Sequence, residues 1–268
     1  QLFYTPDHAR VGDVIPYYEN GEFKLFYLKN WNPYFGSDKT YGWHLLTTKD
    51  LIHYESETAI GILGGTGCII KVEGLYHLYY CVFEDQPQRQ YVCHATSTDL
   101  TNWTKYPDET FGPDESIYLL TDWRDPHVIW NEEEKCWWMI LCAQNQGNTK
   151  RRGCVGLCKS ADLHHWTCCE PLYAPQSSMS AYECPDLFYM NGWWYLVFSQ
   201  FTDRFQTLYR MSRSCNGPWI RPKTDSFDGR AFYAAKTCSD GEHRYIFGWN
   251  PTRTQNTWNF DPDPTHEG

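Results

Sequence analysis

The chain alternates short apolar runs with turn residues at a regular spacing. Five aromatic-rich runs each follow a short turn and start at residues 21, 74, 134, 192 and 242, so the repeat is 50 to 60 residues long. Turns such as Asn20-Gly21 and Asn191-Gly192 have the dipeptide type that closes a tight β-hairpin. Another apolar run lies upstream of each turn, at 13–18, 67–72, 125–130, 184–189 and 231–237. Each unit is therefore predicted to open with a β-hairpin.

A second pattern recurs later in the units. A small polar residue, an Asp, a Leu and then an aromatic residue occur at 48–54, 97–103 and 160–166, with a degenerate copy at 212–219. Asp at this position caps a turn, so the pattern predicts another hairpin. Two hairpins in each of five units predict an all-β fold over residues 1–268, a single five-bladed β-propeller domain with four-stranded antiparallel blades and an active site at the mouth of the central channel. The alternative is an irregular β-sandwich with similar hairpins.

Charge and aromatic content narrow the range of partners. With 23 Lys and Arg against 33 Asp and Glu, the net charge is −10, which argues against nucleic acid or an anionic membrane. The longest clean apolar run has eight residues (136–143), too short to span a bilayer. Aromatic residues make up 18% of the chain, a proportion suited to β-rich cores and to stacking on sugar rings. We therefore expect a small carbohydrate substrate, and the pattern leaves the oligomeric state open.

Twelve cysteines are present without a Cys-x-x-Cys pair. Most lie inside apolar runs, where a free thiol behaves as a small hydrophobic side chain. This distribution favours reduced thiols and a cytoplasmic location. The sequence shows no signal peptide but begins at Gln1 rather than Met, so a secreted mature form remains the alternative.

The candidate chemistry lies at the start of the first strand of each unit. Asp13, Asp125 and Glu183 fall there in the first, third and fourth units, and Thr66 falls there in the second. The first strands of a propeller line its channel, so we expect the three carboxylates to converge at one register. Like charges grouped in a cleft raise at least one pKa, and a carboxylic acid paired with a carboxylate is the arrangement that cleaves a glycosidic bond.

The histidines give no sign of a metal site. His127 follows Asp125 on a predicted inner strand and is expected to be packed or hydrogen-bonded. His164 and His165 fall in an outer hairpin and are expected to be solvated. We therefore predict neither a metal nor a cofactor.

Several motifs, in order along the chain, resemble those of glycoside hydrolase family 32, the invertase, levanase and inulinase family. Arg-Asp-Pro at 124–126 and Glu-Cys at 183–184 are similar to its two main motifs. Further similar stretches occur at 41–43 with 50–51, at 65–68, at 232–234 with Thr237, and at 247–249. The resemblance implies a five-bladed propeller backed by a β-sandwich, which we expect to be absent from this chain, and retaining hydrolysis of terminal β-fructofuranosyl units of sucrose or fructo-oligosaccharides.

The resemblance also implies roles for individual residues. Asp13 would be the nucleophile, Glu183 the general acid and base, and Asp125 the residue that stabilises the transition state. Arg124 would hold a carboxylate or a sugar hydroxyl, and aromatic side chains would stack on the furanose ring, with packing between blades as their alternative. The expected substrate-binding set is Trp31, Trp43, Thr66, Arg124, Tyr233 and Trp249.

The surroundings of the nucleophile depart from the family pattern. The family has Asn-Asp-Pro-Asn where this chain has Gly12-Asp13-Val14-Ile15, so the neighbouring amides are missing. This short stretch also resembles the family 43 propellers, which invert pentofuranosides such as arabinans. Two alternatives therefore stand beside the fructosidase: an inverting pentofuranosidase and a carbohydrate-binding propeller without catalysis.

Overall fold

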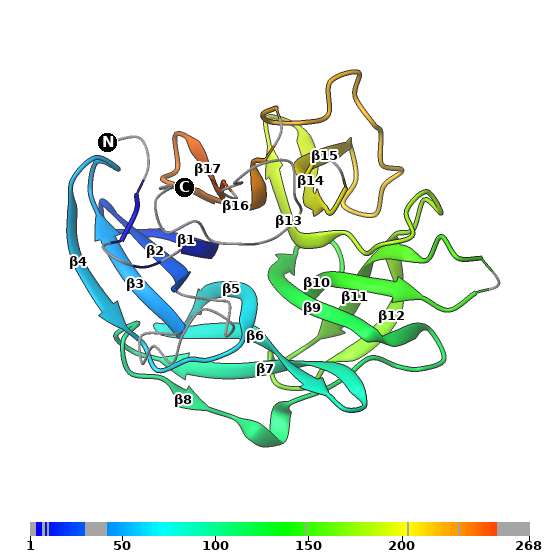
Figure 1. Cartoon of the computed structure of the whole chain (residues 1–268), viewed down its shortest axis with the longest axis horizontal. Coiled ribbons are helices and arrows are strands. Elements are labelled where there is room, and N and C mark those ends of the chain that lie inside the picture. The colour runs from blue at the N-terminus through cyan, green and yellow to red at the C-terminus, as the bar shows by residue number, and fades with distance from the viewer. Residues whose placement is uncertain are drawn as a thin grey trace.

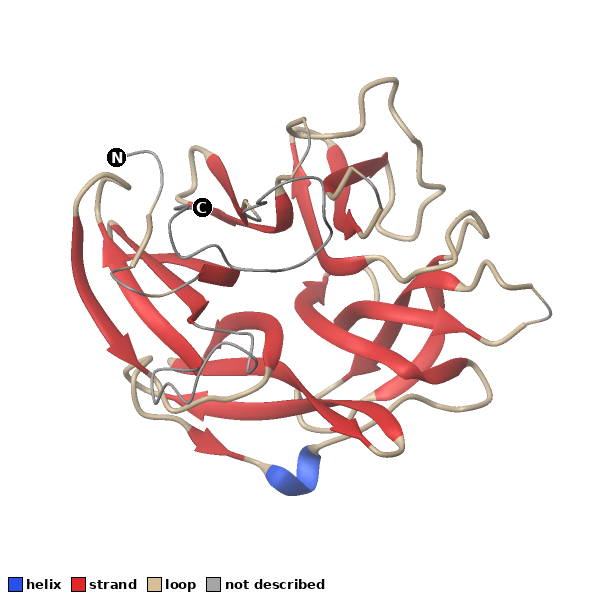
Figure 2. Cartoon of the chain, viewed as in Figure 1, coloured by secondary structure: helices blue, strands red, loops and turns tan. Residues whose placement is uncertain are grey.

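The computed structural model describes residues 4–6, 9, 11–29, 42–147, 149–202, 204–229 and 231–250. These residues form five antiparallel sheets that surround a common centre (Figure 1). In the described part of the chain, helix is limited to the short 3₁₀ turn η2 (Pro107–Glu109; Figure 2), and no helix there is long and apolar enough to cross a membrane.

Three sheets have four strands each, and in all three the strands follow one another in chain order. The first contains β1 (Val11–Glu19), β2 (Glu22–Lys29), β3 (Gly42–Thr48) and β4 (Tyr54–Ala59). The second contains β5 (Gly65–Val72), β6 (Leu75–Asp85), β7 (Gln88–Ser97) and β8 (Thr104–Lys105). The third contains β9 (Tyr118–Asn131), β10 (Cys136–Asn145), β11 (Gly153–Ser160) and β12 (Thr167–Tyr173).

The last two sheets are smaller than predicted. The fourth contains β13 (Glu183–Met190), β14 (Trp193–Gln200) and β15 (Gln206–Ser212), and the fifth contains β16 (Tyr233–Ser239) and β17 (Arg244–Trp249). Within the described residues, the prediction of four strands in every blade is therefore wrong for these two sheets. Among the described residues after β15, Ile220 and Ser226 pair with β15 as isolated bridges rather than as a continuous strand. Pro218 and Pro222 have no backbone N–H to donate to a ladder, which explains the irregular edge.

The predicted turns explain the hairpins. Asn20 and Gly21 both have positive φ (54° and 80°), and Asn191 and Gly192 repeat this (51° and 81°), as a two-residue type I′ turn requires. In the second repeat, Asp99 Oδ1 accepts hydrogen bonds from the backbone N–H groups of residues 101 and 102. The same turn recurs at Asp50 and Asp162. The Asp of the repeat is therefore confirmed as a turn cap.

Neighbouring sheets pack face to face and bury the core at the seams between them. Phe26 and Trp43 of the first sheet pack with Tyr80 of the second, and three more clusters fill the next seams. A further cluster joins the fifth sheet to the first through Cys238 and Phe23, so the ring closes. The first strands β1, β5, β9, β13 and β16 contact one another in the same cyclic order around the centre (Figure 1). The chain is thus an all-β propeller whose first strands surround the channel.

Candidate active site

Each first strand carries a β-bulge, which lies within three residues of the start in four strands and in the middle of β9. In every case two residues of the first strand lie opposite a single residue of the second strand. A bulge turns side chains out of the regular alternation, and bulges are common next to active sites. The bulged pairs are 12–13, 66–67, 125–126, 184–185 and 234–235.

The three predicted carboxylates all lie at these bulges, but not at one position. Glu183 directly precedes its bulge, Asp125 is the first bulged residue, and Asp13 is the second. The prediction that all three share one register is therefore wrong. Relative to Asp125, Glu183 lies one position earlier and Asp13 one position later with respect to the bulge. The first strands reach the channel from different sides, so different positions of the bulge bring the carboxylates together. Asp125 and Cys184 adopt positive φ (58° and 49°), a conformation that is sparsely populated by such residues and concentrated at functional sites.

Asp13 is half-buried near the start of β1. The indole Nε1 of Trp249 donates a hydrogen bond to its Oδ1 at 3.0 Å. Burial, reinforced by the charges of Asp125 and Glu183, raises the pKa of Asp13 to about 7. Near neutral pH Asp13 is therefore divided between its protonated and ionised forms.

Asp125 is 5% exposed. Its Oδ2 accepts a hydrogen bond from the backbone N–H of Cys184 at 2.9 Å, and the Cys184 thiol lies 3.6 Å from the same oxygen. Burial raises the pKa of Asp125 above its ordinary value, against the opposing charge of Arg124. These contacts join β9 to β13 and fix the carboxyl group in place.

Glu183 is oriented from two sides. Arg124 Nη2 donates to Oε1 at 2.8 Å, and the Tyr233 hydroxyl donates a short hydrogen bond to Oε2. Arg124 and Tyr233 directly precede the bulges of their own strands, as Glu183 does, so equivalent positions of three sheets meet here. Arg124 is held in turn by a short hydrogen bond to Asp122 Oδ1 and by Gln90 Oε1 at 3.2 Å.

The other residues of the expected binding set differ in position. Tyr233 stacks on Phe205 with ring centroids 3.7 Å apart, so it combines packing with its contact to Glu183. Thr66 is 1% exposed, and its hydroxyl has no hydrogen-bond partner among the described residues. Trp43 is 2% exposed inside the seam between the first two sheets, and we reassign it to the core. Trp31 lies outside the described residues.

Sequence reasoning missed Lys236, which is 2% exposed next to the carboxylates. Its Nζ donates to the carbonyl oxygen of Pro185 at 3.3 Å, and its charge opposes the upward shift in the pKa of both Asp13 and Asp125. Lys236 is the one charged residue in the apolar run 231–237. A lone cation in a predicted inner strand was the signal that could have identified it.

Asp186 was also missed, and it has a structural role beside the site. It is 1% exposed, and its Oδ2 accepts hydrogen bonds from the backbone N–H and the hydroxyl of Thr237 at 2.6 and 2.7 Å. His127 lies near it and contacts the carbonyl oxygen of Leu187 at 3.3 Å. The prediction of a hydrogen-bonded His127 is thus confirmed.

The family of the chain follows from its sequence as a whole. A model of the glycosyl hydrolases family 32 N-terminal domain matches residues 14–263. The chain belongs to glycosyl hydrolase family 32. The resemblance drawn from the motifs is therefore confirmed, and the family match begins one residue after Asp13.

Curated relatives of this family 32 chain include two kinds of bacterial enzyme. A levanbiose-producing levanase of Bacillus subtilis (strain 168) is 26% identical over 258 residues, covering 88% of this chain and 45% of the levanase. A sucrose-6-phosphate hydrolase of Escherichia coli is 28% identical over 243 residues, covering 77% of this chain and 48% of the hydrolase. The chain thus spans about half the length of the curated relatives it matches.

Solved structures support the fold of this family 32 chain. A GH32 β-fructofuranosidase of Bombyx mori superposes with a TM-score of 0.71 at 24% identity, covering 93% of this chain and 56% of that enzyme. Fructan 1-exohydrolase IIa of Cichorium intybus superposes with a TM-score of 0.71 at 19% identity, covering 92% of this chain and 52% of that enzyme. At these identities the superpositions establish a shared propeller fold.

Proposed function

We propose that the chain is the catalytic propeller of a retaining glycoside hydrolase that removes terminal β-fructofuranosyl units from sucrose or fructans. One observation carries this proposal: Asp13, Asp125 and Glu183 come together at or beside the bulges of three first strands, where the charges of Asp125 and Glu183 raise the pKa of Asp13 and the charge of Glu183 raises that of Asp125. Like charges gathered at one site destabilise a fold, so their grouping favours a catalytic role.

Each carboxyl group has a separate role in this proposal. Asp13 attacks the anomeric carbon as the bond to the leaving oxygen breaks, and Glu183 donates its proton to that oxygen. Glu183 then takes a proton from water, whose oxygen attacks the same carbon and releases Asp13. Asp125, held by Cys184, stabilises the positive charge that develops on the sugar.

The partners of these groups suit the proposed roles. Trp249 donates to the Asp13 oxygen that stays unbonded when the other attacks, so it keeps the carboxylate aligned. Arg124 and Tyr233 orient Glu183 toward the leaving group, in agreement with the role proposed for Arg124 of holding a carboxylate. Substrate binding by relatives supports the choice of sugar, since a mutant of the Bombyx mori enzyme (25% identity, TM-score 0.67) has been solved in complex with sucrose.

We further propose that the two-stranded sheet β16–β17 is the inner part of a fifth blade. Its first strand carries the same bulge as the other four and supplies Tyr233 to the site. Contacts of β16 with both β13 and β1 support this assignment, because they close the ring.

Fructose release from purified protein tests the proposed function. The substrates are sucrose, sucrose 6-phosphate, levan, inulin and an arabinofuranoside, each assayed with wild type, Asp125→Asn and the outer-turn control Asp50→Asn. We expect fructose from at least one fructoside, strong loss in Asp125→Asn and wild-type rates in Asp50→Asn. Cleavage of the arabinofuranoside alone would favour a pentofuranosidase, and sugar binding without turnover by folded protein would favour a binding module; either result overturns the proposal.

A further inference from the structure

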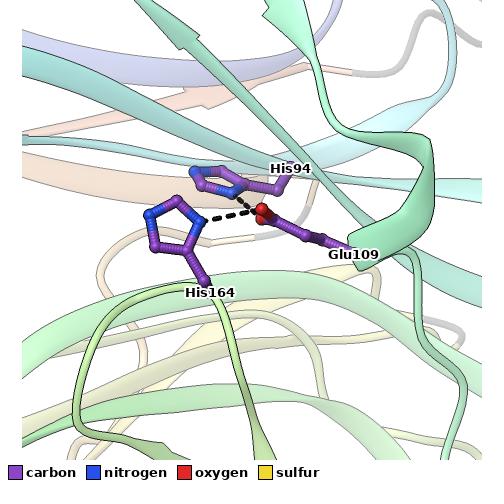
Figure 3. A group of neighbouring side chains, drawn as sticks. All are labelled: His94, Glu109 and His164. Carbon is purple, nitrogen blue, oxygen red and sulfur yellow. Dashed lines mark hydrogen bonds and ion pairs between the residues drawn. The ribbon is translucent and has the colours of Figure 1, made fainter.

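A second cluster of titratable side chains lies at the outer seam between the second and third sheets. His94 comes from β7, Glu109 from η2, and His164 from the turn between β11 and β12 (Figure 3). His164 and His165 were predicted to be solvated. His165 is 88% exposed, whereas the His164 side chain is 38% exposed and its Nδ1 contacts Glu109. The three residues are 15 and 55 positions apart, so no local motif could reveal them.

The three side chains place atoms that can bind a metal ion close together. His94 Nδ1 lies 2.5 Å from one Glu109 oxygen, and His164 Nδ1 lies 2.8 Å from the other. Taking one ligand atom from each side chain, the three atoms lie within 4.8 Å of one another. Zinc–ligand distances of about 2.0–2.2 Å at a tetrahedral centre place ligand atoms about 3.4 Å apart. The side chains of Glu109 and His164 are 21% and 38% exposed, so both have solvent beside them into which to rotate toward that spacing and through which an ion can enter.

The surroundings hold the innermost ligand rigidly. His94 is 3% exposed, and its ring stacks on Tyr79 at 4.5 Å and on Tyr106 at 5.2 Å. The backbone N–H of Tyr106 donates to the carbonyl oxygen of His94 at 3.0 Å, which ties the segment that carries Glu109 to β7. The hydroxyl of Tyr79 donates to the carbonyl oxygen of Leu163 at 2.6 Å and holds the hairpin that carries His164.

A second histidine supports His94 from behind. His77 is 5% exposed, and its Nδ1 lies 3.0 Å from His94 Nε2. Histidines that bind metals usually donate their other ring N–H to a nearby acceptor, which fixes the tautomer. With His94 bound through Nδ1, its Nε2–H can donate to Nδ1 of His77, which holds the ring of His94 from behind.

The donor set selects the class of metal. Imidazole nitrogens suit zinc and the later transition metals, whereas calcium and magnesium prefer sites made of oxygen. Two histidines and one glutamate leave a fourth position for water, as in three-ligand zinc sites. We propose that His94, Glu109 and His164 form a zinc site that joins the second sheet of the propeller to the third. The site is separate from the carboxylates of the channel, and bound zinc would stabilise the folded chain by linking two blades.

Zinc titration of the chelator-treated full chain tests this proposal. Isothermal titration calorimetry gives affinity and stoichiometry, and cobalt substitution gives the ligand type, because thiolate ligands add charge-transfer absorption that nitrogen and oxygen ligands lack. We expect one ion per chain, a cobalt spectrum without thiolate bands, a zinc-dependent rise in Tm, and little effect of calcium or magnesium.

Matched variants locate the ion. His164→Gln and Glu109→Gln, both at partly exposed side chains, are expected to lower zinc affinity by more than about 100-fold, beyond the loss that outer-shell changes cause. His165→Gln, the exposed neighbour, and Glu183→Gln at the channel are expected to bind as wild type does. Equal zinc affinity in wild type and His164→Gln, a cobalt spectrum with thiolate bands, or the absence of stoichiometric binding would overturn the proposal.

Discussion

Aspartates at the inner and outer ends of the sheets are the same residue in opposite electrostatic settings. At the channel, Asp13 meets two other carboxylates, and burial together with these charges raises its pKa to about 7. At the outer turn, Asp99 is exposed and accepts two backbone N–H groups, and these hydrogen bonds lower its pKa. Hydrogen bonds to Asp99 favour its ionised form, whereas the surroundings of Asp13 disfavour its ionised form.

This difference in pKa distinguishes aspartates that stabilise the fold from aspartates that we propose to act in the reaction. Asp50, Asp99 and Asp162 supply acceptors to turns that the backbone would otherwise leave unsatisfied. Asp13 and Asp125 act against the stability of the fold at neutral pH, because each is ionised at a cost. In a propeller whose channel had no catalytic or binding role, replacing Asp13 and Asp125 by neutral residues would increase the stability of the fold.

The change with the largest expected effect is at Asp13. Asp13→Asn removes the proposed nucleophile, so we expect kcat for fructoside hydrolysis to fall by more than about 10⁴-fold. The outer-turn change Asp50→Asn is expected to leave kcat unchanged. Steady-state rates on sucrose or a short fructan measure both, and comparable rates for the two variants would contradict the contrast between inner and outer aspartates.

A somewhat smaller loss is expected at Glu183. Glu183→Gln removes the proposed proton donor but keeps one acceptor oxygen for Arg124, and its amide NH2 can donate to the Tyr233 hydroxyl. General acid–base catalysis contributes about 10² to 10⁴-fold. Aryl fructosides with good leaving groups need less protonation and should be cleaved with a smaller loss. Glu170→Gln on the outer strand β12 is the control, and an equal loss for good and poor leaving groups would remove Glu183 from the acid role.

The same contrast predicts opposite effects on stability. The folded pKa of Asp13, about 7, lies above its unfolded value of about 3.9, so its stabilising contribution is complete below about pH 4 and is lost as pH rises through 7. Asp13→Asn should therefore raise the free energy of unfolding at pH 8 by about 1–3 kcal/mol and change it little at pH 4. Asp99→Ala should lower the free energy of unfolding at pH 8, because two backbone N–H groups of its turn lose the oxygen that accepts their hydrogen bonds. Urea unfolding at the two pH values measures these effects, and a destabilised Asp13→Asn at pH 8 would contradict the electrostatic account.

The smallest expected effect concerns Trp249. Its hydrogen bond to Asp13 opposes the upward shift in pKa, so Trp249→Phe should move the acid limb of the kcat/KM profile to higher pH by about one unit. Tyr195→Phe, on the middle strand β14 of the fourth sheet, is a matched aromatic control. An acid limb that stays in place in Trp249→Phe would mean that another group sets it.

The sequence predicted the hairpins well because their signals are local. Asn-Gly and Glu-Gly turns set positive φ within two residues, and the Ser/Thr-x-Asp-Leu repeat closes its turn through its own side chain. The outer edges of the last two sheets were not predictable in this way. Whether residues 220–226 form a continuous ladder with β15 depends on prolines and on pairing across the sheet, not on apolar periodicity.

The candidate site was predicted in its carboxylates but not in its geometry. Asp13, Asp125 and Glu183 could be found because they recur at the starts of similar runs. Their offsets within the bulges depend on pairing with the second strands, which no local pattern encodes. The burial of Trp43 in the core depends on the packing of two sheets, which the sequence pattern does not show. The contact between His164 and Glu109 likewise depends on the packing of neighbouring sheets.

The measurement that tests the account most directly is a proton NMR time course of the purified chain with a fructoside that it cleaves. Attack by Asp13 followed by water inverts the anomeric carbon twice, so the account predicts that β-fructofuranose appears first and mutarotates afterwards. Initial release of the α-anomer would contradict it, because a single displacement by water leaves Asp13 no role as nucleophile.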